Sequence, residues 1–179
     1  MERGFIPVSI SLLTISDTRS KEDDKSGNLL ENKVIASGHI LYDRKIVKDE
    51  IFEIQEISNK WINNPDVEII ISTGGTGLTG RDVSPEAFRE IFDKEIDGFG
   101  ELFRYLSFKK IGTSTIQSRA IAGVANGTYI FVLPGSPSAC KDAWDEILIN
   151  QLDYRHKPCN FVEIMPRLLE KNLGRSGKK

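Results

Sequence analysis

The apolar run Val67-Glu68-Ile69-Ile70-Ile71-Ser72 leads directly into Thr73-Gly74-Gly75-Thr76-Gly77, and Arg81-Asp82-Val83-Ser84-Pro85 follows shortly afterwards. The run predicts a strand covered on both faces. Glycine accepts backbone angles that other residues avoid and lets a ligand approach the main chain closely. Successive free N–H groups in such a loop form an anion-binding nest. With Asp82 nearby to hold a cation or a reacting group, the stretch predicts a site for a phosphorylated ligand.

Strand and helix patterns alternate along the chain on both sides of this stretch. Strands are expected at 8–15, 39–47, 67–72 and 128–133, and helices at about 28–37, after Asp49, from Ser84, around 99–106 and after Pro137. Ser84 is expected to cap its helix, with proline at the first helical position. The alternation predicts an α/β fold with helices on both faces of an open sheet. Ligands in such folds bind beyond the carboxyl ends of the strands.

Three polar loops follow predicted strands. They comprise 16–20, 73–82 and 134–136, and each is rich in Gly, Ser, Thr or Asp. Right-handed crossovers would bring all three to one edge of the sheet. Three such loops at one edge predict a polar ligand pocket.

Two common nucleotide motifs do not fit. Gly75-x-Gly77-x-x-Gly80 has the spacing of the dinucleotide fingerprint, but the next helix starts only after Arg81 to Pro85, and the required acidic residue after a second strand is missing. No G-x-x-x-x-G-K-[ST] loop is present either, which excludes a standard P-loop.

Several candidate residues also have structural interpretations. Asp49 can cap the helix that begins at Glu50, and Asp17 and Asp82 can be solvated turn residues. Ser118 and Arg119 can begin a short helix. Arg119 is followed by small apolar residues, so its charge is expected at an edge, where arginine binds phosphate bidentately.

Composition narrows the function classes. The net charge of −2 argues against a nucleic-acid-binding field, and two His and two Cys are too few for a zinc site or a disulfide scaffold. No apolar run approaches the roughly 20 residues of a membrane span, and Met1 to Pro7 lacks a signal-peptide core. We therefore expect a cytoplasmic protein with one domain at 1–160 and a C-terminal extension at 161–179, whose basic tail Lys171 to Lys179 frays.

Residues 72–77 and 81–86 resemble the signature of the MoaB/Mog family of molybdenum cofactor biosynthesis proteins, whose domain also occurs in gephyrin. Other segments that resemble the family are 16–19, 24–27, 46–49, 114–123 and 133–137, so the resemblance runs from about Pro7 to Asn160. Segments 95–104 and 157–161 are most similar to the bacterial MoaB branch.

The resemblance implies a three-layer α/β/α sandwich with a mixed, mostly parallel sheet, assembled as a homotrimer or a dimer of trimers. Active members of the family use Mg²⁺ and ATP to transfer AMP to the terminal phosphate of molybdopterin, with release of pyrophosphate. A non-catalytic carrier or auxiliary protein of the same pathway is the alternative, and other pathway proteins are possible partners.

The family's essential carboxylates correspond to Asp49 and Asp82, for which a catalytic role is expected, with Asp82 as a ligand of Mg²⁺. The residues expected to bind molybdopterin or ATP are Ser16, Asp17, Thr73, Gly74, Gly75, Thr76, Gly77, Ser114, Ser118, Arg119, Pro134, Gly135 and Ser136.

Overall fold

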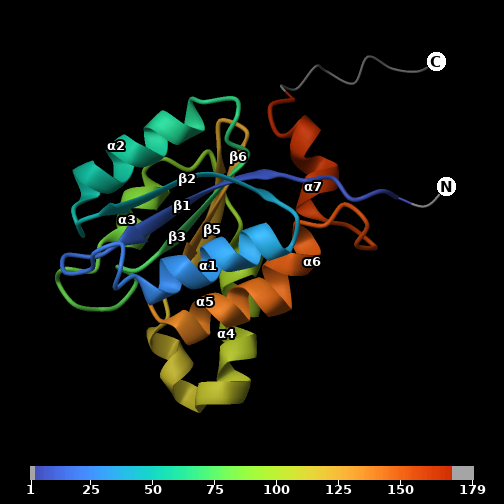
Figure 1. Cartoon of the computed structure of the whole chain (residues 1–179). Coiled ribbons are helices and arrows are strands. Elements are labelled where there is room, and N and C mark those ends of the chain that lie inside the picture. The colour runs from blue at the N-terminus through green and yellow to red at the C-terminus, as the bar shows by residue number, and fades with distance from the viewer. Residues whose placement is uncertain (1–2, 171–179) are drawn as a thin grey trace, which may run out of the picture.

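A six-stranded mixed sheet forms the middle layer of the computed structural model, which describes residues 3–170 (Figure 1). The strands are β1 (Ser9–Ile15), β2 (Ile40–Val47), β3 (Ile69–Thr73), β4 (Lys94–Glu95), β5 (Ile121–Ala125) and β6 (Thr128–Leu133), in the order β2-β1-β3-β6-β5-β4. The four strands β2, β1, β3 and β6 are parallel, while β5 runs antiparallel to both β6 and β4.

Helices cover both faces of the sheet. One face packs against α1 (Lys25–Ala36), α4 (Asp97–Ile111), α5 (Pro137–Ala143) and α7 (Phe161–Ile164), and the other against α2 (Ile51–Ile62) and α3 (Ser84–Arg89). The short helix α6 (Ile149–Gln151) contributes no buried residue. Three short segments complete the chain: the 3-10 helix η1 (Gly112–Gln117), the π-helical η2 (Trp144–Leu148) between α5 and α6, and the 3-10 helix η3 (Met165–Arg167).

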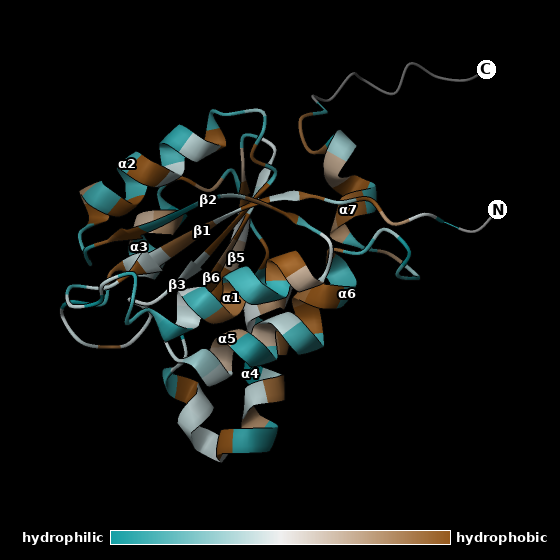
Figure 2. Cartoon of the chain, in the orientation of Figure 1, coloured by the Kyte–Doolittle hydropathy of each residue, from teal (hydrophilic) through white to brown (hydrophobic). Residues whose placement is uncertain are grey.

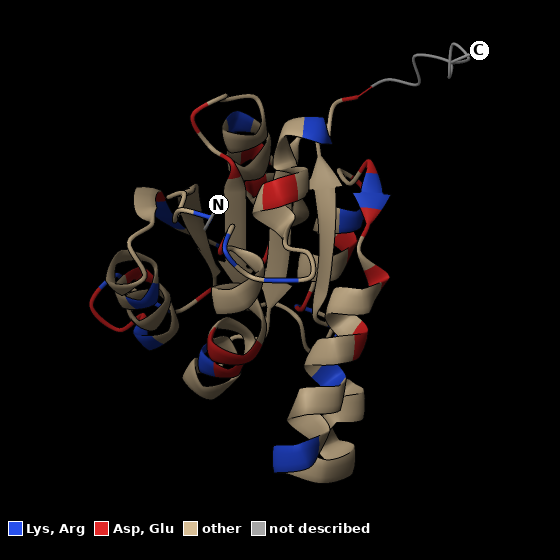
Figure 3. Ribbon diagram, turned by 90° about the vertical axis from the view of Figure 1, so that its right-hand side faces the viewer, with Lys and Arg blue, Asp and Glu red and all other residues tan. Residues whose placement is uncertain are grey.

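The alternation of side chains along each strand divides the core in two. In β1, Ile10 and Leu12 pack under α1 and α5, whereas Leu13 and Ile15 pack under α2 and α3. The central strands β1, β3 and β6 are mostly hydrophobic (Figure 2), with a few Ser and Thr residues, and carry no charged residue (Figure 3). Each fully buried isoleucine contributes roughly 1.5–3 kcal/mol, so the sheet is a rigid base for the loops at its edges.

The three-layer α/β/α architecture with a mostly parallel sheet is confirmed. Two strands were not predicted: β4 has only two residues, and β5 contains three small residues, Ala122, Gly123 and Ala125. The expected cap at Ser84 is wrong. Ser84 is already helical, and its hydroxyl donates to the carbonyl of Gly74 at 2.8 Å, because this contact with the glycine loop replaces capping.

The C-terminal segment packs on the sheet as far as the structure describes it. The rings of Phe161 and Tyr129 lie 4.8 Å apart between centroids, and Val162 is buried. The expected frayed tail at Lys171 to Lys179 lies outside the described residues. Within 3–170, no helix combines the length and apolar character needed to cross a membrane.

His39 is held neutral inside the fold, which makes stability depend on pH. It is 7% exposed, its Nδ1 accepts the Val8 N–H at 3.3 Å, and its ring lies between Phe5 and Trp144. Burial lowers the pKa of His39 below 6.5, against a weaker opposing effect of Asp153. The unfolded chain therefore takes up a proton more readily, so stability is full above pH 6.5 and declines below it.

We predict that the free energy of unfolding falls as the pH drops from 7 to 5, because protonated Nδ1 no longer accepts from Val8. Urea titrations at several pH values measure this. In His39→Asn, whose side-chain oxygen replaces Nδ1 as acceptor, the loss should shrink by about 1 kcal/mol. An unchanged pH dependence in the variant would assign the effect to another group.

Candidate functional site

The carboxyl ends of the central strands bring the polar loops into one row. Thr14 of β1 pairs with Thr73 of β3, which pairs with Leu133 of β6. The loops that follow these strands therefore begin side by side, as the sequence predicted. The antiparallel strand β5 starts at the same edge, since Ile121 pairs with Val132, and this places Ser118 and Arg119 beside the glycine loop.

Only glycine fits at the start of the central loop. Gly74 and Gly75 have φ angles of +107° and +63°, a region that favours glycine. A Cβ atom on Gly74 would collide with the carbonyl oxygen of Ile15, and one on Gly75 with the side chains of Ser84 and Asp49. The loop therefore lies directly against β1 and against the carboxylate of Asp49.

The carbonyl groups of this loop are bonded to the protein. The Ser84 hydroxyl donates to the carbonyl of Gly74 at 2.8 Å, and the Ser84 N–H donates to that of Gly75 at 3.0 Å. In a planar trans peptide the following N–H points the opposite way. The N–H groups of Gly75 and Thr76 have no acceptor among the described residues, so they are free to bind an oxyanion.

Arg119 supports the loop from behind. Its Nε donates to the carbonyl of Gly77 and its Nη2 to that of Asp82, both at 2.8 Å, while Nη1 pairs with Glu86. The sequence predicted Arg119 as a phosphate ligand. Because its donors are engaged in this way, the structure shows it anchoring the loop, and ligand contact by Arg119 stays a prediction.

Asp82 is charged and lies against Gly77. Its Oδ2 accepts the Thr79 N–H at 2.9 Å and the Thr79 hydroxyl at 2.6 Å. Burial alone would raise the pKa of Asp82, but the hydrogen bonds of Thr79 and of the Gly77 N–H, together with the charge of Arg119, hold it below its ordinary value. A Cβ on Gly77 would come within 2.7 Å of this carboxylate.

Asp49 does not cap a helix. The residue before α2 is Glu50, and neither its side chain nor that of Asp49 caps the helix. The Asp49 Oδ1 is buried and has no hydrogen-bond partner among residues 3–170. Burial, followed by the nearby charges of Asp17 and Asp82, raises the pKa of Asp49 to about 6. An unpartnered carboxylate of this kind is poised to accept a cation or a proton.

Asp17 joins the other loops through an exposed arginine. Arg81 donates to both carboxylate oxygens of Asp17 at 3.0 and 3.1 Å and to Glu50 at 3.0 Å. Asp17 also accepts the Asp49 N–H at 3.2 Å. These pairs are solvent-exposed and add little stability, but they connect the first loop, the glycine loop and the start of α2.

A cavity of about 390 Å³ opens beside the glycine loop. Eight of the predicted residues line it: Gly75, Thr76, Gly77, Asp82, Ser118, Pro134, Gly135 and Ser136. The Ser118 hydroxyl is buried and has no hydrogen-bond partner in the part of the chain that the structure describes. The opposite wall comes from α4, η1 and α5 through Phe103, Ser107, Ile111, Gln117 and Ala139, which the sequence did not suggest. The helical spacing of Phe103 is typical of a core residue, so the sequence pattern does not distinguish this cavity wall from the core.

The other predicted residues lie around this cavity. Ser16 accepts the N–H groups of Thr18 and Arg19 at 3.3 and 3.2 Å, and Thr73 donates to the carbonyl of Pro134 at 2.9 Å. Both therefore shape loops. Ser114 is exposed in η1 and does not line the cavity. The binding role of these three residues stays a prediction.

Comparison with known proteins identifies the family of this chain. The family model described as a probable molybdopterin binding domain matches residues 11–154. Molybdenum cofactor biosynthesis protein B of Escherichia coli K12 is 52% identical over 157 residues, or 88% of this chain and 92% of that protein. This chain belongs to the MoaB/Mog family of molybdenum cofactor biosynthesis proteins. The resemblance inferred from the sequence motifs is thus confirmed.

Solved structures of this family have the same fold. A crystal structure of molybdenum cofactor biosynthesis protein B matches with a TM-score of 0.81 at 40% identity, covering 84% of this chain and 94% of that one. The tungsten cofactor synthesizing protein MoaB of Pyrococcus furiosus matches with a TM-score of 0.72 at 33% identity, covering 79% and 91%.

Magnesium fits the donors that this family member presents. Among residues 3–170, no three Asp, Glu, His or Cys side chains are grouped to hold a metal by themselves. Mg²⁺ is usually held by one or two carboxylates together with substrate phosphates and water. The unpartnered Oδ1 of Asp49 and the charged carboxylate of Asp82 match that smaller requirement.

We predict that Asp49→Asn stabilises the ligand-free protein. The pKa of Asp49 is raised from 3.8 to about 6, so ionisation opposes folding progressively between these pH values and fully above pH 6. The full shift corresponds to about 3 kcal/mol, which solvent screening of a half-buried group reduces to about 1–2 kcal/mol. Urea unfolding in EDTA should show this gain at pH 7 and almost none at pH 4. A loss of stability at pH 7 would mean that an unseen partner satisfies the Asp49 carboxylate.

Proposed function

We propose that the protein acts in molybdenum cofactor biosynthesis by binding molybdopterin in this cavity and transferring AMP to it from Mg-ATP. One observation carries the proposal: the carboxylates of Asp49 and Asp82 lie against Gly75 and Gly77 of a single loop, whose intervening N–H groups are free. Nucleotidyl transfer depends on positioning and charge neutralisation and needs no protein nucleophile.

In the proposed reaction, an oxygen of the terminal phosphate of molybdopterin attacks the α-phosphorus of ATP. A new P–O bond forms, the bond from the α-phosphorus to the oxygen bridging it to the β-phosphorus breaks, and pyrophosphate leaves with that electron pair. The products are adenylylated molybdopterin and pyrophosphate. No proton transfer is required when the attacking phosphate is ionised.

The residues of the cavity are suited to hold the reactants. The N–H groups of Gly75 and Thr76 would bind phosphate oxygens. The Ser118 hydroxyl, which has no protein partner, would bind the pterin, and Phe103 and Ile111 of the opposite wall would pack against a flat heterocycle. A magnesium ion bound to Asp49, Asp82 and the phosphates would neutralise the charge that develops at the transferring phosphoryl group.

A protein that only binds molybdopterin is the alternative. Thr79 and the Gly77 N–H already bond the Asp82 carboxylate, which leaves it fewer lone pairs for a metal ion. Incubation of the purified protein with molybdopterin, ATP and Mg²⁺, followed by chromatography of the pterins, separates the two possibilities. Adenylylated product supports the enzyme, and bound but unmodified molybdopterin supports the carrier.

We predict that Asp82→Asn lowers the turnover by about 10²–10³-fold, because the neutral amide no longer binds the metal or opposes its charge. The affinity for molybdopterin should change far less. The matched control is Asp66→Asn, an exposed aspartate in the loop before β3, at the opposite end of the parallel strands. Steady-state rates of pyrophosphate release measure both variants. Full activity of Asp82→Asn would remove Asp82 from the mechanism.

We also propose that the chain assembles as a homotrimer or a dimer of trimers. The helix α4 and the turn after it project beyond the sheet (Figure 1). The exposed apolar side chains on this projection are Leu102, Tyr105, Phe108, Ile111 and Ile116. Several exposed apolar side chains on one projecting element are typical of an interaction surface.

We predict that Phe108→Asp shifts the protein toward the monomer, because it places a charge in the apolar contact. Phe52→Asp, at the exposed Phe52 on α2, is the matched control. Sedimentation velocity over a range of concentrations reports the mass of each variant. If Phe52→Asp dissociates the protein and Phe108→Asp does not, the interface lies on the layer of α2 and not on that of α4.

A further inference from the structure

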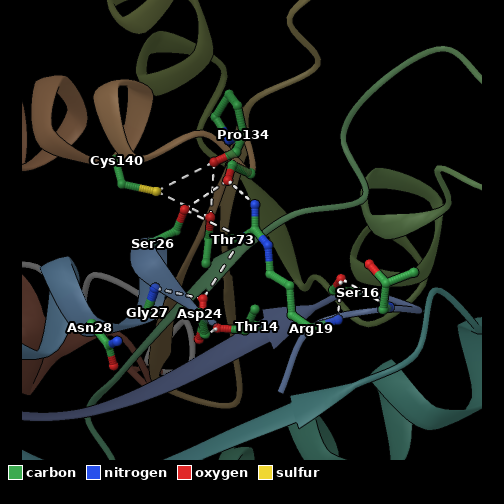
Figure 4. A network of polar contacts seen from close by, with 12 residues as sticks. Thr14, Ser16, Arg19, Asp24, Ser26, Gly27, Asn28, Thr73, Pro134 and Cys140 are labelled. Atoms are coloured by element: carbon green, nitrogen blue, oxygen red, sulfur yellow. Dashed lines mark hydrogen bonds and ion pairs between the residues drawn. The ribbon is translucent and has the colours of Figure 1, made fainter. Parts of the chain in front are cut away.

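A buried carboxylate lies directly before α1. Asp24 is fully buried and accepts the Thr14 hydroxyl at 2.6 Å and the Gly27 N–H at 2.9 Å (Figure 4), and it also accepts Arg44 Nη2 at 2.8 Å. Burial by itself raises the pKa of Asp24, but these hydrogen bonds outweigh it and hold the pKa below its ordinary value. A charge is retained in the interior only where it is paired in this way. The carboxylate therefore fixes the start of α1 to β1.

The start of α1 in turn holds the third loop of the site. The buried Ser26 hydroxyl donates to the carbonyl of Gly135 at 2.7 Å. Arg19 Nη2 donates to the same carbonyl at 3.1 Å, while Nη1 lies 3.7 Å from Asp24 (Figure 4). Two donors from the first loop and α1 thus converge on one carbonyl oxygen more than 100 positions away in the chain.

The preceding carbonyl, that of Pro134, is held by residues of β3 and α5. The Thr73 hydroxyl donates to the carbonyl of Pro134 at 2.9 Å, and Cys140 Sγ donates to it at 3.4 Å. Both peptides are trans, so the N–H groups of Gly135 and Ser136 point away from these donors. Neither N–H has an acceptor among the described residues, and both residues line the cavity.

We propose that Ser26 and Arg19 are positioning residues, which orient the Gly135–Ser136 peptide so that its N–H binds a phosphate group of the ligand. They act through the Gly135 carbonyl and do not touch the ligand. The assignment rests on the proposed function only in taking the cavity as a site for a phosphorylated ligand. It extends to this loop the arrangement of the glycine loop, in which bonded carbonyls leave N–H groups free.

The test uses inorganic pyrophosphate as the probe and ¹⁵N NMR as the readout. In the wild type, pyrophosphate should shift the amide signals of Gly135 and Ser136. Ser26→Ala should weaken its binding about fivefold to tenfold, because one hydrogen bond that fixes the peptide is lost. It should also reduce the shift at Ser136. The matched control is Ser58→Ala, which also removes a fully buried serine hydroxyl. Unlike that of Ser26, the Ser58 hydroxyl has no hydrogen-bond partner among the described residues.

A second variant protects the test against misfolding of the first. Arg19→Met removes the other donor at a half-buried position, because its thioether carries no N–H group, and should weaken pyrophosphate binding in the same direction. Thermal melts confirm that each variant is folded. The proposal would be overturned if pyrophosphate did not shift the Gly135 and Ser136 amide signals of the wild type. It would also be overturned if the folded variants bound pyrophosphate with unchanged affinity. If these amides respond as expected but no adenylylated pterin forms, the proposed reaction fails and the positioning role stands.

Discussion

The parallel pairing of β1, β3 and β6 is the constraint on which the rest of the site depends. Because Thr14, Thr73 and Leu133 pair in one row, the three loops leave the sheet side by side. A shift of one residue in any of these pairings would turn every side chain of that strand to the other face. The side chains of β1 and β3 are close-packed between helices on both faces and so oppose such a shift, which means that the packing of the core sets the geometry of the site.

Within that frame, the loops are ordered through their carbonyl groups. Ser84 holds the carbonyls of Gly74 and Gly75, Arg119 holds that of Gly77, and Ser26 with Arg19 holds that of Gly135. Each bond has two effects. It satisfies an acceptor that would otherwise be costly to bury, and it directs the next N–H to the opposite side. The donors come from different elements, so the order of the loops depends on the whole fold.

The sequence predicted the strands and the glycine loop better than the side-chain contacts that hold the loops. Runs such as Ile69 to Ile71 are β-branched and unbroken, and glycines after a strand mark a close backbone approach, so these features could be predicted. The role of Ser84 could not, because a serine before a proline suits a helix cap as well as a bond to a distant carbonyl. The same holds for Arg119, whose fork fits a phosphate or two carbonyls equally well. The wall formed by α4 was missed because Phe103 repeats at the spacing of a core residue.

The charges at this edge bear on how a phosphorylated ligand binds. The charges of Asp17 and Asp82 lie close enough to Asp49 to raise its pKa, and polyphosphate adds further negative charge. The arginines at this edge are already engaged: Arg81 pairs with Asp17 and Glu50, Arg119 pairs with Glu86, and Arg19 lies beside Asp24. Peptide N–H groups supply only partial positive charge. A phosphorylated ligand bound together with a cation is therefore better neutralised at this edge than a bare anion. Such a cation can bind Oδ1 of Asp49 without breaking a hydrogen bond, because this oxygen has no partner among the described residues.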